Sequence, residues 1–160
     1  MSPGFHQPKA PRTVKLFACP VCANTLYFEN WQCERCHARL GYLPHRNEMA
    51  AADGGAGNWR TAAAPANNAA ACANASHFVC NWLVVEDDRG PFCQACRHNG
   101  VIPLLSGPRN RDAWALIEVA KRRLFYSLLR WQLPLPTRKD NPHSGLRFEF
   151  LADGPGSGPR

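Results

Sequence analysis

The sequence contains no long apolar run. Residues 1–9 are rich in proline, glycine and polar side chains, where a secretory signal would need an apolar segment. No stretch approaches the roughly 20 apolar residues of a membrane-spanning helix. These absences predict a soluble, cytoplasmic protein with no membrane partner. Thiols stay reduced in that compartment, so its cysteines are available to bind metal.

Bulky apolar side chains are also scarce. Hydrophobic residues make up 45% of the 160 residues, but alanine inflates that fraction. A large continuous core is therefore not expected, and small modules of this kind need a disulfide or a metal to hold them together. The eight cysteines are the candidates for that role.

The first four cysteines form two C-x2-C pairs separated by ten residues: Cys19, Cys22, Cys33 and Cys36. A C-x2-C turn presents two sulfurs to one ion, and two such turns joined by a hairpin complete the tetrahedron of a closed structural zinc site. Unliganded core cysteines or redox pairs are the alternatives. Because paired spacing of this kind is rarely accidental, we predict a zinc site.

The second four cysteines are spaced less regularly: Cys72, Cys80, Cys93 and Cys96. Only Cys93 and Cys96 form a C-x2-C turn, and His77 could replace Cys72 as a ligand. Four thiolates leave no position open for water or substrate, so we predict two structural Zn²⁺ ions with a role in folding. Iron in a four-thiolate site is an alternative that colour would reveal.

These patterns predict a small, metal-stabilised α+β fold in which two zinc-ribbon-like β modules precede a long amphipathic helix. Eleven alanines among residues 49–71, interrupted by glycine and Pro65, indicate a linker with Trp59 as its one large aromatic residue. The expected segments are a disordered leader (1–12), a first zinc ribbon (13–48), an Ala/Gly-rich linker (49–70), a second zinc ribbon (71–105), the amphipathic helix (106–133), and a strand-like segment with a flexible tail (134–160).

The helix has an apolar stripe and a basic side. The stripe consists of Ile117, Ala120, Leu124, Leu128 and Trp131, at helical spacing. We interpret the helix as packed, with its charged face in solvent. Nucleic-acid binding through Lys121, Arg122 and Arg123 is the alternative, and the formal charge of +7 invites it. The cysteine modules, however, lack a basic surface that would extend such a footprint.

Ten segments of the sequence carry a further signal: residues 15–19 (KLFAC), 26–30 (LYFEN), 40–44 (LGYLP), 72–75, 80–84 (CNWLV), 91–97 (PFCQACR), 120–124, 126–129, 133–136 and 148–153. Together they resemble a bacterial family of zinc-binding metallopeptidases that begin with a zinc-ribbon region. The resemblance covers residues 15–153 in order. It favours Cys72 over His77 as a ligand.

The resemblance also implies an H-E-x-x-H helix further along the chain, with two zinc ligands and a general-base glutamate. None of the six histidines here begins that pattern. We therefore expect the ribbon region of the family, truncated or separately encoded, with no catalytic residues of its own. Its expected function is interaction with the missing peptidase domain or another protein. Without that domain, the apolar stripe would be partly exposed and would favour self-association.

Overall fold

The computed structural model describes residues 15–53, 58–66, 68–85, 90–107 and 109–152. The leader expected at 1–12 lies outside these residues, as does the end of the expected tail. The elements are β1 (Phe17–Ala18), β2 (Thr25–Leu26), β3 (Leu40–Leu43), β4 (Glu48–Ala52), β5 (Trp59–Arg60), β6 (Ala69–Ala71), the 3-10 helix η1 (Ala73–His77), β7 (Leu83–Val85), the 3-10 helix η2 (Cys96–His98), β8 (Asn99–Val101), α1 (Asn110–Arg130) and β9 (Phe148–Glu149). The predicted small α+β fold is confirmed.

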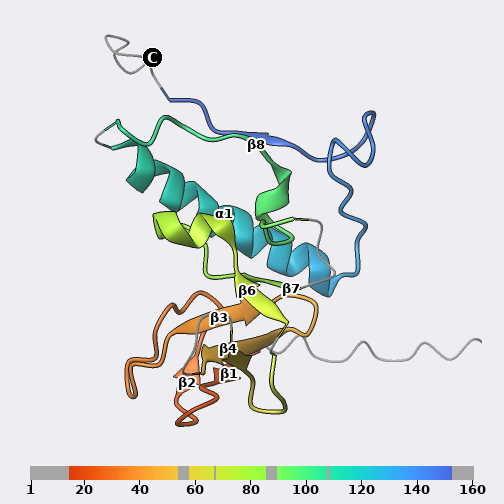
Figure 1. Ribbon diagram of the computed structural model, residues 1–160. Helices are drawn as coiled ribbons and strands as arrows, with labels where there is room; N and C mark the ends of the chain where they lie inside the picture. Colours follow the sequence, from red (N-terminus) through yellow and green to blue (C-terminus); the bar gives the residue numbers. More distant parts are fainter. Residues whose placement is uncertain (1–14, 54–57, 67, 86–89, 108, 153–160) are drawn as a thin grey trace, which may run out of the picture.

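The strands form four small sheets. Strands β1 and β2 pair antiparallel, β3, β4 and β5 form an antiparallel sheet in that order, and β6 pairs antiparallel with β7. Strand β8 pairs in parallel with β9, which joins the C-terminal segment to the second ribbon. In Figure 1, β1 to β4 lie at one end of the molecule, β6 and β7 in the middle, and α1 and β8 beyond them.

The Ala-rich stretch contains strands, so the expected linker is wrong for its described residues. Most of strand β4, strand β5 and the start of β6 fall within residues 49–70. Ala50 and Trp59 are buried in one cluster with Leu43 and Leu83. Because alanine has a side chain of one carbon, it allows neighbouring backbones to approach closely. Within this stretch Ala50, Ala51, Trp59 and Ala69 are buried, whereas Ala62, Ala63 and Ala64 are exposed.

The two ribbons pack against each other. The rings of Tyr42 and Trp82, one from each ribbon, have centroids 5.1 Å apart, and both side chains are fully buried. The side-chain amide of Asn81 donates hydrogen bonds of 2.7 and 3.1 Å to the carbonyl oxygens of Phe28 and Asn30. The cysteines of both ribbons therefore border one shared core.

Gly41 of β3 marks the closest approach between the ribbons. A Cβ atom at this position would lie 2.5 Å from Cδ2 of Leu83 in β7. Leu83 is only 1% exposed, so its side chain has little room to move aside. A side chain of any size at position 41 would push the two sheets apart.

Helix α1 does not pack through the predicted stripe but through a face roughly a quarter-turn away from it. Its buried residues are Trp114, Glu118, Lys121, Arg122 and Phe125. Ile117 and Leu124 of the stripe are 50% and 45% exposed, and Leu128 is half-buried. The expectation that the charged face lies in solvent is wrong, because Lys121 and Arg122 find hydrogen-bond acceptors in the second ribbon and on the helix itself.

Candidate metal centres

The first cluster is built by two similar turns. Cys19 and Cys22 lie in the turn between β1 and β2, and Cys33 and Cys36 lie in the turn before β3. The amides of Ala23 and His37 donate hydrogen bonds of 2.9 Å to the carbonyl oxygens of Cys19 and Cys33, which closes each turn. Ala23 and His37 have φ values of 60° and 59°, so both turns end in the left-handed region.

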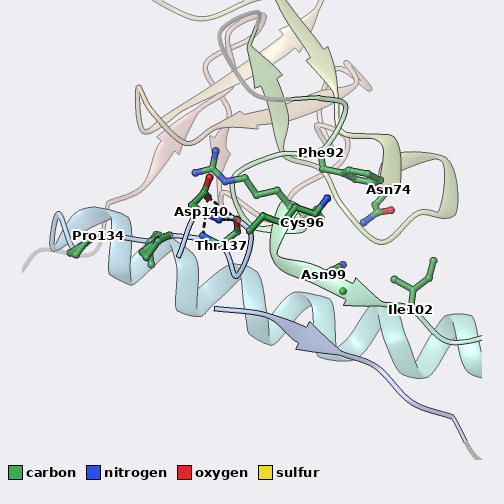
Figure 2. Close-up of a pocket in the computed structure, with 13 residues that line it drawn as sticks. Asn74, Phe92, Cys96, Asn99, Ile102, Pro134, Thr137 and Asp140 are labelled. Atoms are coloured by element: carbon green, nitrogen blue, oxygen red, sulfur yellow. Dashed lines mark hydrogen bonds between the residues drawn. The ribbon is translucent and has the colours of Figure 1, made fainter. Parts of the chain in front are cut away.

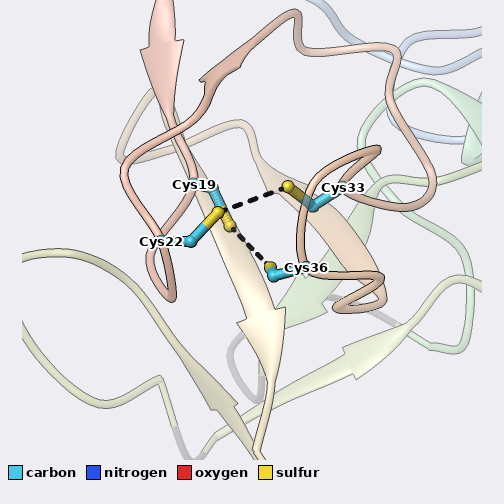
Figure 3. A group of neighbouring side chains, drawn as sticks. All are labelled: Cys19, Cys22, Cys33 and Cys36. Atoms are coloured by element: carbon cyan, nitrogen blue, oxygen red, sulfur yellow. Dashed lines mark hydrogen bonds between the residues drawn. The ribbon is translucent and has the colours of Figure 1, made fainter.

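The four sulfur atoms of the first cluster converge. Figure 3 shows Cys19 opposite Cys36 and Cys22 opposite Cys33, with Sγ–Sγ distances of 3.7 and 3.6 Å. All four sulfurs lie within 4.8 Å of one another. A tetrahedral zinc ion with Zn–S bonds of about 2.3 Å holds its sulfurs about 3.8 Å apart, whereas a disulfide needs about 2.05 Å. The spacing fits zinc and excludes disulfides.

The second cluster joins residues that are further apart in the sequence. Cys72 precedes η1, Cys80 follows it, Cys93 lies in a turn, and Cys96 begins η2. The Sγ atoms of Cys80 and Cys93 are 3.6 Å apart, and the backbone amide of Cys93 donates to the Cys72 sulfur at 3.4 Å. All four sulfurs again lie within 4.8 Å of one another.

His77 lies away from this second group of sulfurs. Its ring packs instead against Trp114 of α1, with the centroids 6.1 Å apart. Among the described residues, the candidate metal-binding groups contain cysteines alone. The structure thus gathers the eight cysteines predicted from the sequence into two groups of four. His77, the alternative ligand, belongs to neither group.

The local surroundings favour the thiolate form of some sulfurs over others. A hydrogen bond from the backbone amide of Cys36 lowers the pKa of the Cys33 thiol to about 6. In the second cluster, hydrogen bonds from Cys80, Cys93 and Cys96 lower the pKa of the Cys72 thiol, whereas burial raises the pKa values of Cys80 and Cys93. The pKa of the Cys96 thiol is also lowered. Because metal ligands must be thiolates, the thiols with lowered pKa values lose their protons most readily when metal binds.

A buried polar network connects the second cluster to α1. Oε2 of Glu118 lies 3.9 Å from the Cys96 sulfur. Oε1 of Glu118 accepts hydrogen bonds from Trp114 at 3.0 Å, Asn99 at 2.8 Å and Lys121 at 2.7 Å. The sequence analysis missed this network. Its only sequence signal is the i, i+3, i+4 spacing of Glu118, Lys121 and Arg122, which places charged side chains on one helical face.

The basic residues of α1 are engaged within the protein. Lys121 is paired with Glu118, and Arg122 donates to the backbone carbonyl of Val79; both cations are buried. Arg123 is exposed, but its guanidinium forms an ion pair of 2.7 Å with Glu29 of the first ribbon. These residues therefore do not form a basic surface for nucleic acid.

A cleft of about 1150 Å³ lies beside the second cluster. In Figure 2, Thr137 and Asp140 come from the segment after α1, and Asn99 comes from β8. Oδ2 of Asp140 accepts hydrogen bonds from the amide and the hydroxyl of Thr137, at 3.1 and 2.7 Å. Cys96 lines the cleft but is only 2% exposed, so the cluster lies behind the cleft wall. The sequence analysis did not identify this cleft.

The described part of the chain contains no helix long and apolar enough to cross a membrane.

Two family models match successive parts of the chain. Residues 16–107 match a zinc-ribbon domain. Residues 110–159 match the family described as "Putative zinc-binding metallo-peptidase". The second match begins at the first residue of α1. The boundary between the two matches therefore coincides with the start of the helix.

The chain is also similar to uncharacterized proteins of Mycobacterium bovis and Mycobacterium tuberculosis. Each is 32% identical over 136 residues, which is 85% of this chain and 37% of the relative. The chain thus spans little more than a third of the length of these relatives. No solved structure matches it. The two four-cysteine sites and the family match support two structural zinc ions. The chain belongs to the zinc-ribbon domain family, and its match to the metallo-peptidase family follows directly after the ribbon.

Proposed function

We propose that this chain is a double zinc-ribbon module with a structural and interaction role, forming the N-terminal part of a zinc metallo-peptidase. The observation that carries the proposal is the sulfur geometry. Two sets of four cysteines reach the spacing of a tetrahedral zinc site, with Sγ–Sγ distances of 3.6 to 3.7 Å.

In this proposal, each ion is held by four thiolates. The ligands of the first are Cys19, Cys22, Cys33 and Cys36, and those of the second are Cys72, Cys80, Cys93 and Cys96. A zinc ion bound in this way contributes folding free energy, with apparent binding on the order of 10–16 kcal/mol in small zinc modules. The strands of these ribbons are two to five residues long, so they depend on such a contribution.

The chain itself is proposed to be non-catalytic. A zinc ion with four thiolate ligands has no position for water or substrate, and the sequence has no H-E-x-x-H pattern. Peptidase activity, in our proposal, belongs to the part of the longer family members that this chain does not include. The engagement of Lys121, Arg122 and Arg123 within the protein leaves nucleic-acid binding without a supporting observation.

The test combines native mass, metal identification and a count of free thiols after unfolding with a chelator. We expect two zinc ions and eight reactive thiols per chain. The variants Cys22→Ser and Cys80→Ser should each retain one zinc ion. The matched control is Ala95→Ser, which adds a hydroxyl to the buried Cys93–Cys96 turn without removing a sulfur, and it should retain two.

Other results would contradict specific parts of the proposal. One zinc ion in the unmodified chain would remove one site, iron would change the metal, and missing thiols would indicate disulfides. Peptide hydrolysis by the purified chain, abolished by a chelator, would overturn the non-catalytic assignment.

A further inference from the structure

The outward face of α1 is apolar along most of the helix. We define this outward face by Ala113, Leu116, Ile117, Ala120 and Leu124, which recur at spacings of three and four and contain no charged side chain. All five are exposed, Leu116 to 74%. A soluble surface helix normally shows the reverse pattern, with apolar residues inside. Contiguous exposed apolar faces of this kind mark interaction sites.

The helix is fixed in this orientation by its other face. Trp114 and Phe125 are at most 1% exposed, and Arg122 donates to the Val79 carbonyl in the second ribbon. Turning the outward face inward would bring Glu118 and Lys121 into solvent and break their bonds to Asn99. Because both groups are satisfied where they are, a rotation of α1 cannot bury the outward face. The outward face is therefore available to a partner.

The family matches indicate what that partner is. The zinc-ribbon match ends at residue 107, and the metallo-peptidase match begins at residue 110 and includes all of α1. The matched region is 37% of the length of the mycobacterial relatives, so most of each relative lies outside it. By the family matches, α1 therefore belongs to the peptidase part, although its buried face packs on the second ribbon.

We propose that the outward face of α1 is the surface on which the remainder of the metallo-peptidase packs. The occupant is an apolar element of that peptidase part, joined to this chain or carried by a separate one. Ala113 and Ala120 leave room for its side chains between the larger Leu116, Ile117 and Leu124, as in ridges-into-grooves packing. The proposal deepens the proposed function, because it gives the interaction role a surface and a partner.

The experiment places a photo-crosslinking benzoylphenylalanine at Leu116 in the natural gene and identifies the crosslinked peptides by mass spectrometry. The matched control places it at Leu16, which is 55% exposed on the first ribbon. We expect peptides from a metallo-peptidase-family segment to crosslink to position 116 roughly tenfold more than to position 16. In the same background, Leu124→Ser should lower the yield at position 116 by roughly tenfold, the loss expected when a central contact is truncated.

Each other outcome overturns the proposal. Peptides from the same region of a second copy would make the outward face a self-association surface, and peptides from an unrelated protein would assign a different partner. Equal yields at positions 116 and 16 would show that nothing specific covers the helix. Zinc content is measured on the unmodified chain and on every variant. Two ions with a failed crosslink would refute the docking surface alone, whereas an unmodified chain without zinc would refute the proposed function.

Discussion

The first cysteine cluster is partly open to solvent, whereas the second is enclosed. Cys22 and Cys36 are half-buried, but all four cysteines of the second cluster are buried. The first cluster is held by two turns of nearly identical geometry. The second is assembled from more distant segments and lies against Glu118 of α1.

The two clusters therefore place the same set of four cysteine ligands in different structural settings. In the first ribbon, the metal site needs only its own turns, and the sequence spacing of the cysteines describes it almost completely. In the second, the metal site depends on a helix that begins 14 residues after its last cysteine. Metal and helix should support each other there, so disruption of either one should affect the other.

Loss of a ligand in each cluster gives the largest expected difference. Cys80→Ser should remove one zinc ion and also release α1, because Cys80 is fully buried beside Val79, the acceptor of the Arg122 hydrogen bond. Cys22→Ser should remove one zinc ion and leave α1 in place. Removing a structural zinc costs several kcal/mol or more. Zinc stoichiometry and helical circular dichroism check this; equal helix loss in both variants would contradict the comparison.

Truncation of Trp82 should affect both ribbons together. Its indole is fully buried against Tyr42 of the first ribbon, so Trp82→Ala should destabilise the chain by about 3–5 kcal/mol. Leu16→Ala, at an exposed position, serves as the control and should change stability little. Denaturant unfolding measures both variants. If the Trp82 variant lost one ribbon and kept the other unchanged, the ribbons would be independent units.

Arg122 and Arg123 attach α1 to the rest of the chain through a buried contact and an exposed contact, respectively. Arg122→Met leaves the buried carbonyl of Val79 without its donor and should cost about 2 kcal/mol. Arg123→Met removes an ion pair with Glu29 whose arginine is largely exposed, and should change stability much less. Thermal unfolding of the zinc-loaded variants measures the difference. Equal costs would mean that the link from α1 to the first ribbon matters as much as its contact with the second.

Chelator competition should show a difference in rate. A metallochromic chelator should remove zinc from the first cluster about tenfold faster, equivalent to about 1.4 kcal/mol in the barrier, because Cys22 and Cys36 are accessible to solvent. The fast phase should disappear in Cys22→Ser and remain in Cys80→Ser. A single phase in the unmodified chain would show that burial does not control release.

The cysteine spacing predicted the two clusters, because the chemistry of four thiolates around one ion is nearly independent of the rest of the fold. The helix was predicted at 106–133 and is observed at Asn110–Arg130. Its orientation was not predictable from periodicity, which identifies an apolar face but not what that face contacts. Burial of Lys121 depends on Asn99, and burial of Arg122 depends on Val79, both distant in sequence.

The prediction of a linker in the Ala-rich segment was wrong for a related reason. Alanine, glycine and asparagine are typical of a linker, and local composition gave no indication that Ala50 and Ala51 would be fully buried. Trp59 was the one useful signal, since a large aromatic residue is unusual in a flexible segment. It is buried in β5 and contacts the cluster that contains Leu43 and Leu83.

The contact between Gly41 and Leu83 has a consequence for how this sequence can diverge. The cysteines are constrained by coordination chemistry, but position 41 is constrained by space alone: even one added methyl group would overlap Leu83. A larger residue there becomes acceptable only if position 83 becomes smaller at the same time. Among distant homologues, these two positions should therefore change together, because the two ribbons are closely packed at this contact.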